Sequence, residues 1–203
     1  MSHYFTNDES LKHQIRTFQY TFHGQTLTFQ SDLGVFAKDR VDFGTHVLLE
    51  HLPAFNDEAI LDIGCGVGVV GLLIAKAYPH TKIVCSDVNR RALELTEINR
   101  DFNKIKQVTI IESDLYQSIP QTFDAIITNP PIRAGQKVVH VIFEEGKNHL
   151  NPGGSIIAVV QKKQGALSLQ EKMMEVFSNV TILGKESGYY VFMSRKEDHD
   201  EKQ

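Results

Sequence analysis

The fold is decided by one stretch of sequence, Ile60-Leu61-Asp62-Ile63-Gly64-Cys65-Gly66-Val67-Gly68. An apolar run from Ala59 stops there at three glycines on alternate positions, and a helical apolar pattern resumes over residues 69–77. Glycine suits such a turn because it adopts backbone conformations closed to other residues and lets a ligand approach closely. We therefore expect a strand, a tight ligand-binding turn and a helix.

An acidic side chain, Asp87, ends the next apolar run at residues 82–86. It follows Gly68 by nineteen residues, the interval at which nucleotide-binding units place a carboxylate on ribose hydroxyls. A plain strand-to-helix turn with packing glycines would not require this acid. The two features together predict a bound nucleoside.

The charges around the glycines indicate which nucleoside to expect. Gly66-Val67-Gly68-Val69-Val70-Gly71 also fits the dinucleotide fingerprint, but Asp62 lies just before it and residues 57–75 contain no Lys or Arg. A phosphate would be repelled by that carboxylate, and a P-loop is excluded because no Gly-Lys-Ser/Thr ending follows. S-adenosylmethionine has no phosphate and carries an ammonium and a sulfonium, so it is the cofactor we expect.

A second motif, Asn129-Pro130-Pro131, ends the buried-strand pattern of residues 124–128. Proline has a fixed φ and no backbone N–H, so the strand stops there and we expect the carbonyls to be free and rigidly aimed. The Asn129 side-chain oxygen and the Pro130 carbonyl could accept both N–H bonds of an exocyclic amine or a side-chain amide and turn its lone pair toward a methyl group. The motif therefore favours methyl transfer over a structural Asn-Pro turn.

Strand-like and helical runs alternate along the chain, which predicts an α/β fold with a parallel sheet. Residues 18–22 and 26–29 alternate polar and apolar residues around His23-Gly24, which predicts an N-terminal β-hairpin. The short connection at residues 184–188 predicts that the last two strands pair antiparallel. The strand-like runs are residues 59–63, 82–86, 107–112, 124–128, 154–160, 179–183 and 189–194, and helical spacing occurs at 41–52, 69–77, 90–99 and 167–177.

The two motifs resemble those of the class I S-adenosylmethionine-dependent methyltransferases, and in particular the small methyltransferase domain of the ribosomal RNA guanine-N2 enzymes of the RsmC type. The similarity extends over about residues 18–196. It implies a Rossmann-like fold with a seven-stranded, mostly parallel sheet and an antiparallel final hairpin. The activity it implies is methyl transfer to an exocyclic amine, with guanine N2 of small-subunit ribosomal RNA as the expected acceptor.

The resemblance also implies the site residues. Asn129-Pro130-Pro131-Ile132 would receive the target amine and act as the catalytic group. Residues 34–36 and 41–45 resemble the entry loop and helix that close over the cofactor. The residues expected to bind the cofactor are Phe36, Asp62, Gly64, Cys65, Gly66, Asp87, Val88, Asp114, Leu115 and Asn129.

The sequence departs from the family at two points. Ile132 stands where many relatives carry Tyr, Phe or His, so stacking on a base must come from elsewhere, or aliphatic groups must sandwich the base. The two-domain relatives contain a second, degenerate copy of the fold, which 203 residues cannot hold. We expect residues 1–40 to form an extension with the hairpin, 41–196 the methyltransferase domain and 197–203 a charged, disordered tail.

Two cations, Arg133 and Lys137, flank the Asn-Pro-Pro motif at a strand end, where α/β folds bind ligands. We expect them to contact substrate phosphates, although solvated surface lysines are common. The expected partner is ribosomal RNA or the small ribosomal subunit. Two alternatives stay open. One is a glutamine amide of a release factor, whose methyltransferases carry Tyr in place of Ile132, and the other is a non-catalytic cofactor-binding module in ribosome assembly.

Composition sets further limits. The chain is 41% hydrophobic with a formal net charge of −4, which suits one globular domain and argues against binding nucleic acid by bulk charge alone. Its two cysteines, Cys65 and Cys85, favour the reducing cytoplasm. No apolar stretch approaches the ~20 residues that span a membrane, so we expect no membrane partner. The nine histidines lack metal-ligand spacing, so we expect no metal.

Overall fold

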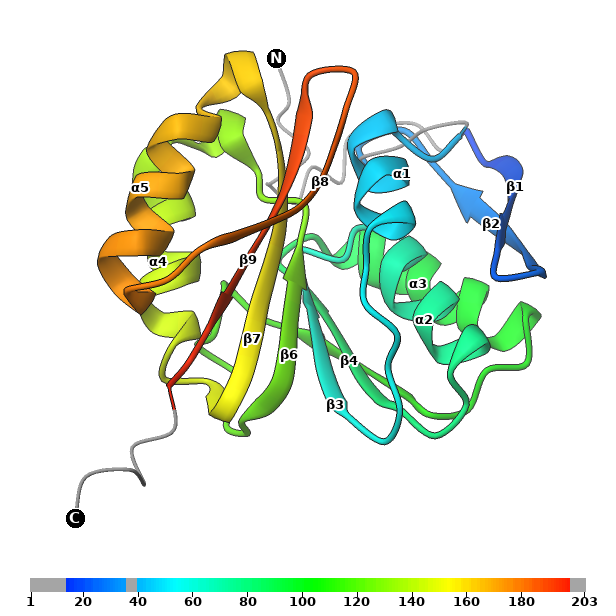
Figure 1. Ribbon diagram of the computed structural model, residues 1–203. Coiled ribbons are helices and arrows are strands. Elements are labelled where there is room, and N and C mark those ends of the chain that lie inside the picture. Colours follow the sequence, from blue (N-terminus) through cyan, green and yellow to red (C-terminus); the bar gives the residue numbers. More distant parts are fainter. Residues whose placement is uncertain (1–13, 36–39, 198–203) are drawn as a thin grey trace.

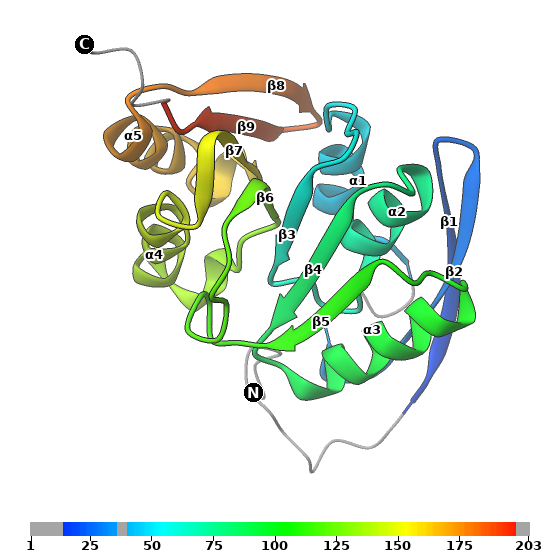
Figure 2. The same ribbon diagram turned by 90° about the horizontal axis from the view of Figure 1, so that it is seen from below.

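The computed structural model describes residues 14–35 and 40–197. Its centre is a seven-stranded sheet in the order β5-β4-β3-β6-β7-β9-β8 (Figures 1 and 2). The first five strands in this order are parallel neighbours, whereas β9 pairs antiparallel with both β7 and β8. The mostly parallel sheet with an antiparallel final hairpin is thus confirmed. The strands are β3 (Ala59–Ile63), β4 (Lys82–Asp87), β5 (Val108–Glu112), β6 (Phe123–Thr128), β7 (Leu150–Gln161), β8 (Thr181–Glu186) and β9 (Tyr189–Arg195).

Helices cover both faces of this sheet (Figure 1). One hydrophobic core joins the sheet to α1, α2 and α3, and a second joins it to α4 and α5. The central strands are buried on both faces, with Ile60, Leu61, Ile126 and Ile127 all at 0% exposure, as parallel strands between helical layers require. The helices are α1 (Phe43–Glu50), α2 (Val69–Ala77), α3 (Arg90–Phe102), α4 (Gln136–Gly146) and α5 (Ala166–Phe177), with short 3₁₀ turns η1 (Ile132–Ala134) and η2 (Lys162–Gln164).

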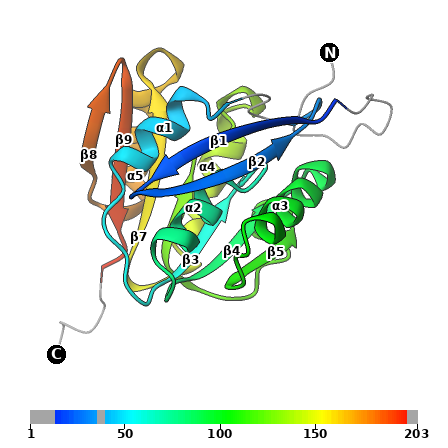
Figure 3. The same ribbon diagram turned by 90° about the vertical axis from the view of Figure 1, so that its right-hand side faces the viewer.

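The predicted N-terminal hairpin is present as β1 (Arg16–Phe22) and β2 (Gln25–Ser31). Its two-residue loop has positive φ at both positions, 47° at His23 and 72° at Gly24, as a type I′ turn requires. The hairpin buries Phe22 and Phe29 against the core shared with α2 and α3, and it lies outside these helices (Figure 3).

Two asparagines, Asn99 in α3 and Asn103 directly after that helix, bind the outer edge of β2. Asn99 accepts from the Gln30 N–H at 2.7 Å and donates to the Gln30 carbonyl at 3.0 Å. Asn103 does the same with Thr28 at 3.1 and 2.8 Å. Because each side-chain amide offers a donor and an acceptor, the pair replaces a neighbouring strand and satisfies the open edge. Asn99 also donates to the Val67 carbonyl at 3.0 Å and so joins the hairpin to the glycine turn.

The structure differs from the sequence-based expectations in the elements that follow the Asn-Pro-Pro motif. Helix α4 was not predicted, although it buries Val139, Ile142, Phe143 and Gly146 at helical spacing. Its many β-branched residues are typical of strands, which obscures that spacing. The division of the chain at residue 40 stays a prediction, and residues 198–203 of the expected tail lie outside the described residues. No helix within the described ranges is both long and apolar enough to cross a membrane.

The hairpin contacts predict unequal roles for the two asparagines. Asn99 is fully buried and forms hydrogen bonds with both β2 and the glycine turn. Asn99→Ala should therefore lower the free energy of unfolding by about 3 kcal/mol, the cost of several unpaired buried groups. Asn103→Ala, at a partly exposed position, should cost about 1 kcal/mol. Equilibrium urea denaturation of both variants measures this difference, and equal losses would contradict it.

Candidate active site

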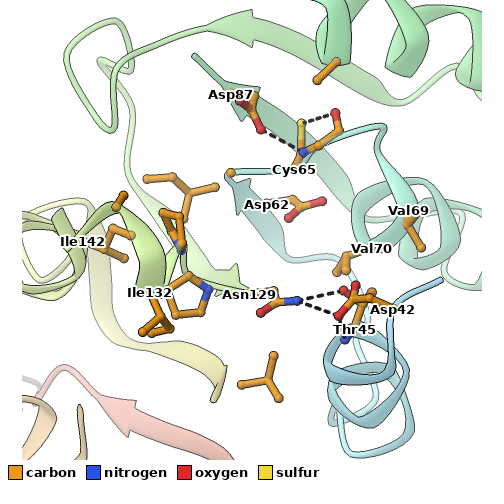
Figure 4. A pocket seen from close by; sticks show the side chains of 18 of the residues that line it. Asp42, Thr45, Asp62, Cys65, Val69, Val70, Asp87, Asn129, Ile132 and Ile142 are labelled. Atoms are coloured by element: carbon orange, nitrogen blue, oxygen red, sulfur yellow. Dashed lines mark hydrogen bonds between the residues drawn. The ribbon is translucent and has the colours of Figure 1, made fainter. Parts of the chain in front are cut away.

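A pocket of about 670 Å³ opens at the carboxyl ends of the parallel strands. The turns after β3, β4, β5 and β6 line it, together with the start of α1 and of β9. Ligands of open α/β sheets bind at this edge, and the volume suits a nucleoside-sized molecule. Figure 4 shows part of the lining side chains.

The three alternate glycines form the predicted turn. Gly64, Gly66 and Gly68 have φ values of 72°, 56° and 83°, so each lies in the left-handed region that favours glycine. The backbone N–H groups of Gly64 and Cys65 both donate to the Ser86 carbonyl, at 2.8 and 2.9 Å, which fixes the turn to β4. A Cβ built at Gly64 or Gly66 would meet no atom within 4 Å, so the turn presents a bare backbone to open space.

Asp87 lies at the end of β4, as predicted, and holds the backbone around it. Its Oδ2 accepts from the Gly66 N–H and its Oδ1 from the Asn89 N–H, both at 2.9 Å (Figure 4 draws the first contact). Burial raises the pKa of this carboxyl above its usual value, while these hydrogen bonds lower it. Each carboxylate oxygen has a second acceptor position, so Asp87 can also receive ribose hydroxyls.

Asp62, at the fourth position of β3, is only 3% exposed. The pKa of Asp62 is raised to about 7, mainly by burial. A 2.8 Å hydrogen bond from the Gly71 N–H lowers this pKa, and the nearby Asp87 charge contributes to the increase. A carboxyl in this position changes charge near neutral pH. It is suited to a cationic group that enters the pocket.

The charge of the pocket agrees with the expected cofactor. The described lining includes four aspartates, Asp42, Asp62, Asp87 and Asp114, and no described lining residue is Lys or Arg. Such a wall disfavours phosphates and suits an ammonium and a sulfonium. Within the described ranges, the Ser86 hydroxyl is buried and has no hydrogen-bond partner, and it lines the same pocket. A polar ligand can supply that partner, so the residues fit S-adenosylmethionine.

The Asn129 amide has a defined orientation. Its Nδ2 donates to Thr45 Oγ1 at 3.0 Å and to Asp42 Oδ1 at 3.3 Å, both at the start of α1. In Figure 4 the amide nitrogen faces these two side chains and the oxygen points away from them. Among the described residues none donates to the oxygen, which is therefore available to a substrate N–H.

The start of α1 is itself fixed. Asp42 is the N-cap of the helix and accepts from the Thr45 N–H at 3.1 Å, with the same oxygen that receives the Asn129 amide. Capping holds the Asp42 side chain in place, because an N-cap carboxylate satisfies a helix N–H that has no other partner. One cap therefore orients the side chain that the sequence identifies as catalytic.

The expectation that the carbonyls of the Asn-Pro-Pro turn are free is wrong. The Pro130 carbonyl accepts from the Ile132 N–H at 2.8 Å, and the Pro131 carbonyl from the Ala134 N–H at 2.8 Å. Pro131 has φ −76° and ψ 76°, the values of an inverse γ-turn, which brings the Ile132 N–H back onto Pro130. The second lone pair of the Pro130 oxygen remains for a substrate, and the turn makes that oxygen more rigid.

The residues expected to face adenine are Val88 after β4 and the segment after β5. The Ser113 N–H donates to the Asp87 carbonyl at 3.0 Å, and the Ser113 hydroxyl donates to the Leu115 carbonyl at 2.8 Å. Val88, Asp114 and Leu115 all line the pocket, and Val88 is 37% exposed there. An apolar surface of this kind suits the face of a purine.

The pocket brings together most of the residues that the sequence singled out. Phe36 lies outside the described residues, and the Arg133 side chain is not described. Lys137 is exposed on α4 and does not line the pocket. The others line it: Asp62, Gly64, Cys65, Gly66, Asp87, Val88, Asp114, Leu115, Asn129, Pro130, Pro131 and Ile132.

Sequence reasoning missed three contributions to the site. Asp42 and Thr45 entered only through a resemblance, and nothing paired them with Asn129, although an Asp before an apolar helix is a recognisable N-cap signal. Tyr189 was assigned only to a strand, and no sequence signal places it at the pocket.

The thiols of Cys65 and Cys85 are both buried. The hydrogen bond between them and their burial raise the pKa of Cys65, so Cys65 is a poor nucleophile.

Comparisons with known proteins agree with this site. The family model "Methyltransferase small domain" matches residues 26–193. A protein of Bacillus subtilis named "Uncharacterized protein YbxB" is 43% identical over 197 residues, 96% of this chain and 98% of that protein. "Ribosomal RNA small subunit methyltransferase C" of Vibrio vulnificus is 31% identical over 185 residues, 89% of this chain and 53% of that protein.

A solved structure of a 16S rRNA N2 methyltransferase (RsmC) from T. thermophilus, in complex with AdoMet and guanosine, is 25% identical with a TM-score of 0.81. The matched region covers 90% of this chain and 51% of the T. thermophilus chain. The chain thus spans about half the length of the ribosomal RNA methyltransferases that it matches. From the family match, the chain belongs to the methyltransferase small domain family, and its cofactor is S-adenosylmethionine, which the residues of the pocket fit.

Proposed function

We propose that this protein transfers a methyl group from S-adenosylmethionine to the exocyclic N2 amine of a guanine in small-subunit ribosomal RNA. The observation that carries the proposal is the orientation of Asn129, whose Nδ2 is held by Thr45 and Asp42 while its oxygen is left for a substrate. An acceptor with two N–H bonds and a lone pair is what this arrangement suits. The name of the V. vulnificus relative supports small-subunit ribosomal RNA as the substrate, and the guanosine in the T. thermophilus complex supports guanine as that acceptor.

The chemistry requires little acid or base from the protein. Bound S-adenosylmethionine supplies an electrophilic methyl group on a cationic sulfur. Asn129 Oδ1 accepts one amine N–H and the Pro130 carbonyl the other, which turns the nitrogen lone pair out of conjugation with the ring. The bound cofactor would supply the methyl carbon, its carbon–sulfur bond would break as the nitrogen attacks, and an amine proton would leave afterwards to water. Positioning of the amine therefore supplies most of the acceleration.

The substrate partner and the compartment belong to this proposal. Ribosomal RNA or the small subunit is the expected partner, with Arg133 and Lys137 as candidate phosphate contacts, and the cytoplasm is the expected location. A glutamine amide also offers two N–H bonds, so the Asn129 geometry alone does not distinguish it from guanine. Transfer of labelled methyl groups to 30S subunits, to naked ribosomal RNA and to release factors distinguishes them. Labelling of release factors alone would overturn the RNA proposal.

Asn129→Ala should lose turnover and retain the cofactor. Deletion of one preorganised hydrogen-bonding group typically lowers kcat by roughly a hundredfold to a thousandfold. Single-turnover methyl transfer measures the rate, and calorimetry measures cofactor affinity. Asn151→Ala is the matched control, because Asn151 is the second residue of β7, at the end of the strand away from the pocket, and bonds Asp124. A normal rate in Asn129→Ala would refute the mechanism.

Asp87→Ala should weaken cofactor binding by roughly tenfold to a hundredfold, because it removes a charged acceptor for the ribose hydroxyls and loosens the glycine turn. Glu112 provides the control. It ends the neighbouring strand in register with Asp87, pairs with Arg90 at 2.9 Å and does not line the pocket. Glu112→Ala should leave the calorimetric affinity unchanged, and an equal loss in both variants would contradict the assignment.

Cofactor affinity should rise with pH through the titration of Asp62. With a pKa of about 7, Asp62 is mostly neutral at pH 6 and mostly anionic at pH 7.5, and only the anion attracts the cofactor's ammonium. We expect the affinity to increase roughly five- to tenfold over this interval. Asp62→Asn should bind weakly and lack this increase. Calorimetry across the range is the measurement, and a flat wild-type profile is the contrary outcome.

A further inference from the structure

Two aromatic rings stand at the substrate side of the pocket, and the proposed chemistry does not use them. Phe43 and Tyr189 supply the only aromatic rings among the described lining residues. Their ring centroids are 5.4 Å apart with the planes at 67°, an edge-to-face pair. Phe43 is 41% exposed, although the rest of its helix buries Val47, Leu48 and Leu49. An apolar ring held partly open beside a pocket is available to a ligand.

The pair is positioned relative to Asn129 by short connections. Phe43 is the first residue of α1 and directly follows Asp42, whose Oδ1 receives the Asn129 amide. Tyr189 opens β9, which runs beside α1 (Figures 1 and 3). A Cβ at Gly44 would lie 3.0 Å from Tyr189 Cε1, so a glycine at this helical position lets the tyrosine approach.

The opposite side of Asn129 is aliphatic. Ile132 and Pro131 line the pocket there, and Figure 4 shows Asn129 between Ile132 on one side and Asp42 on the other. A planar acceptor whose edge meets the Asn129 oxygen therefore lies in a pocket whose lining includes both the aliphatic Ile132 and the aromatic pair. Rings favour a flat π system over a flexible amide side chain.

Two exposed lysines lie in the turn that is joined to the start of β9. Lys162 and Lys163 are exposed in η2. The Lys162 N–H donates to the Gly188 carbonyl at 2.7 Å, which joins η2 to the turn before Tyr189. Lysines combined with aromatic rings are typical of surfaces that bind single-stranded nucleic acid.

We propose that Phe43 and Tyr189 form the wall on which the acceptor base stacks. The inference rests on the proposed function, because it assigns further substrate-binding residues to the same site. Loss of either ring should weaken binding of the base and leave the cofactor untouched.

The test uses a short single-stranded oligouridylate with one 2-aminopurine, a fluorescent base that carries the exocyclic amine of guanine. Stacking quenches this fluorescence, and the chain has no Trp to interfere. With the full chain saturated with S-adenosylhomocysteine, Phe43→Leu and Tyr189→Leu should each weaken binding roughly tenfold to a hundredfold. Tyr189→Phe keeps the ring and should bind as wild type does. Phe102→Leu, at a ring 62% exposed on α3 and outside the pocket, is the matched control.

The outcomes separate this inference from the proposed function. Wild-type affinity in both Leu variants, or no binding by the wild type, overturns the aromatic wall even if ribosomal RNA is methylated. Binding that depends on both rings, without methyl transfer to any RNA, supports the wall and overturns the proposed activity. Calorimetry of S-adenosylhomocysteine with each variant completes the test, and a parallel loss of cofactor affinity in the Leu variants would also overturn the assignment.

Discussion

The hydrogen bonds between the glycine turn and the end of β4 are the constraint on which the site depends. The Ser86 carbonyl receives two N–H groups of the turn, and the Asp87 carboxylate receives a third from Gly66. A turn of three left-handed glycines would otherwise have wide conformational freedom. Because its donors are fixed to the next parallel strand, the turn is ordered by the same register that places Asp87 beside it. The pairing of β3 with β4 therefore also fixes the turn that is expected to hold the cofactor.

The substrate side depends on a contact between segments that are distant in sequence. Asn129 directly follows β6, and its anchors Asp42 and Thr45 precede it by 87 and 84 residues. The helix cap and the Asn129 amide share one carboxylate oxygen, so a shift of α1 would also release Asn129. The start of α1 carries Phe43 as well. If the proposed substrate contacts Phe43, its binding is coupled physically to the orientation of the Asn129 amide.

The sequence predicted best where a local pattern is sufficient. Strand β3 and helix α2 have the predicted bounds, because an apolar run, alternate glycines and a helical period are each visible within a few residues. The pairing of Asn99 with the edge of β2 and of Asn129 with Asp42 could not be predicted, since a single sequence does not show which distant polar groups meet. The error at the Pro130 carbonyl has a local origin, because the ψ angle of Pro131 decides whether the Ile132 N–H reaches that carbonyl, and the sequence does not fix ψ.

Burial of Asp62 links the stability of the free protein to its ligand. The folded-state pKa of about 7 exceeds the ordinary value of 3.8, so the folded chain binds the proton more tightly than the unfolded chain does. Between these two pH values the free protein loses stability as pH rises, because a charge must then form in a buried site. A cation bound beside Asp62 offsets that loss. The acid that disfavours the empty fold at neutral pH is therefore the group that makes binding of a cationic cofactor favourable.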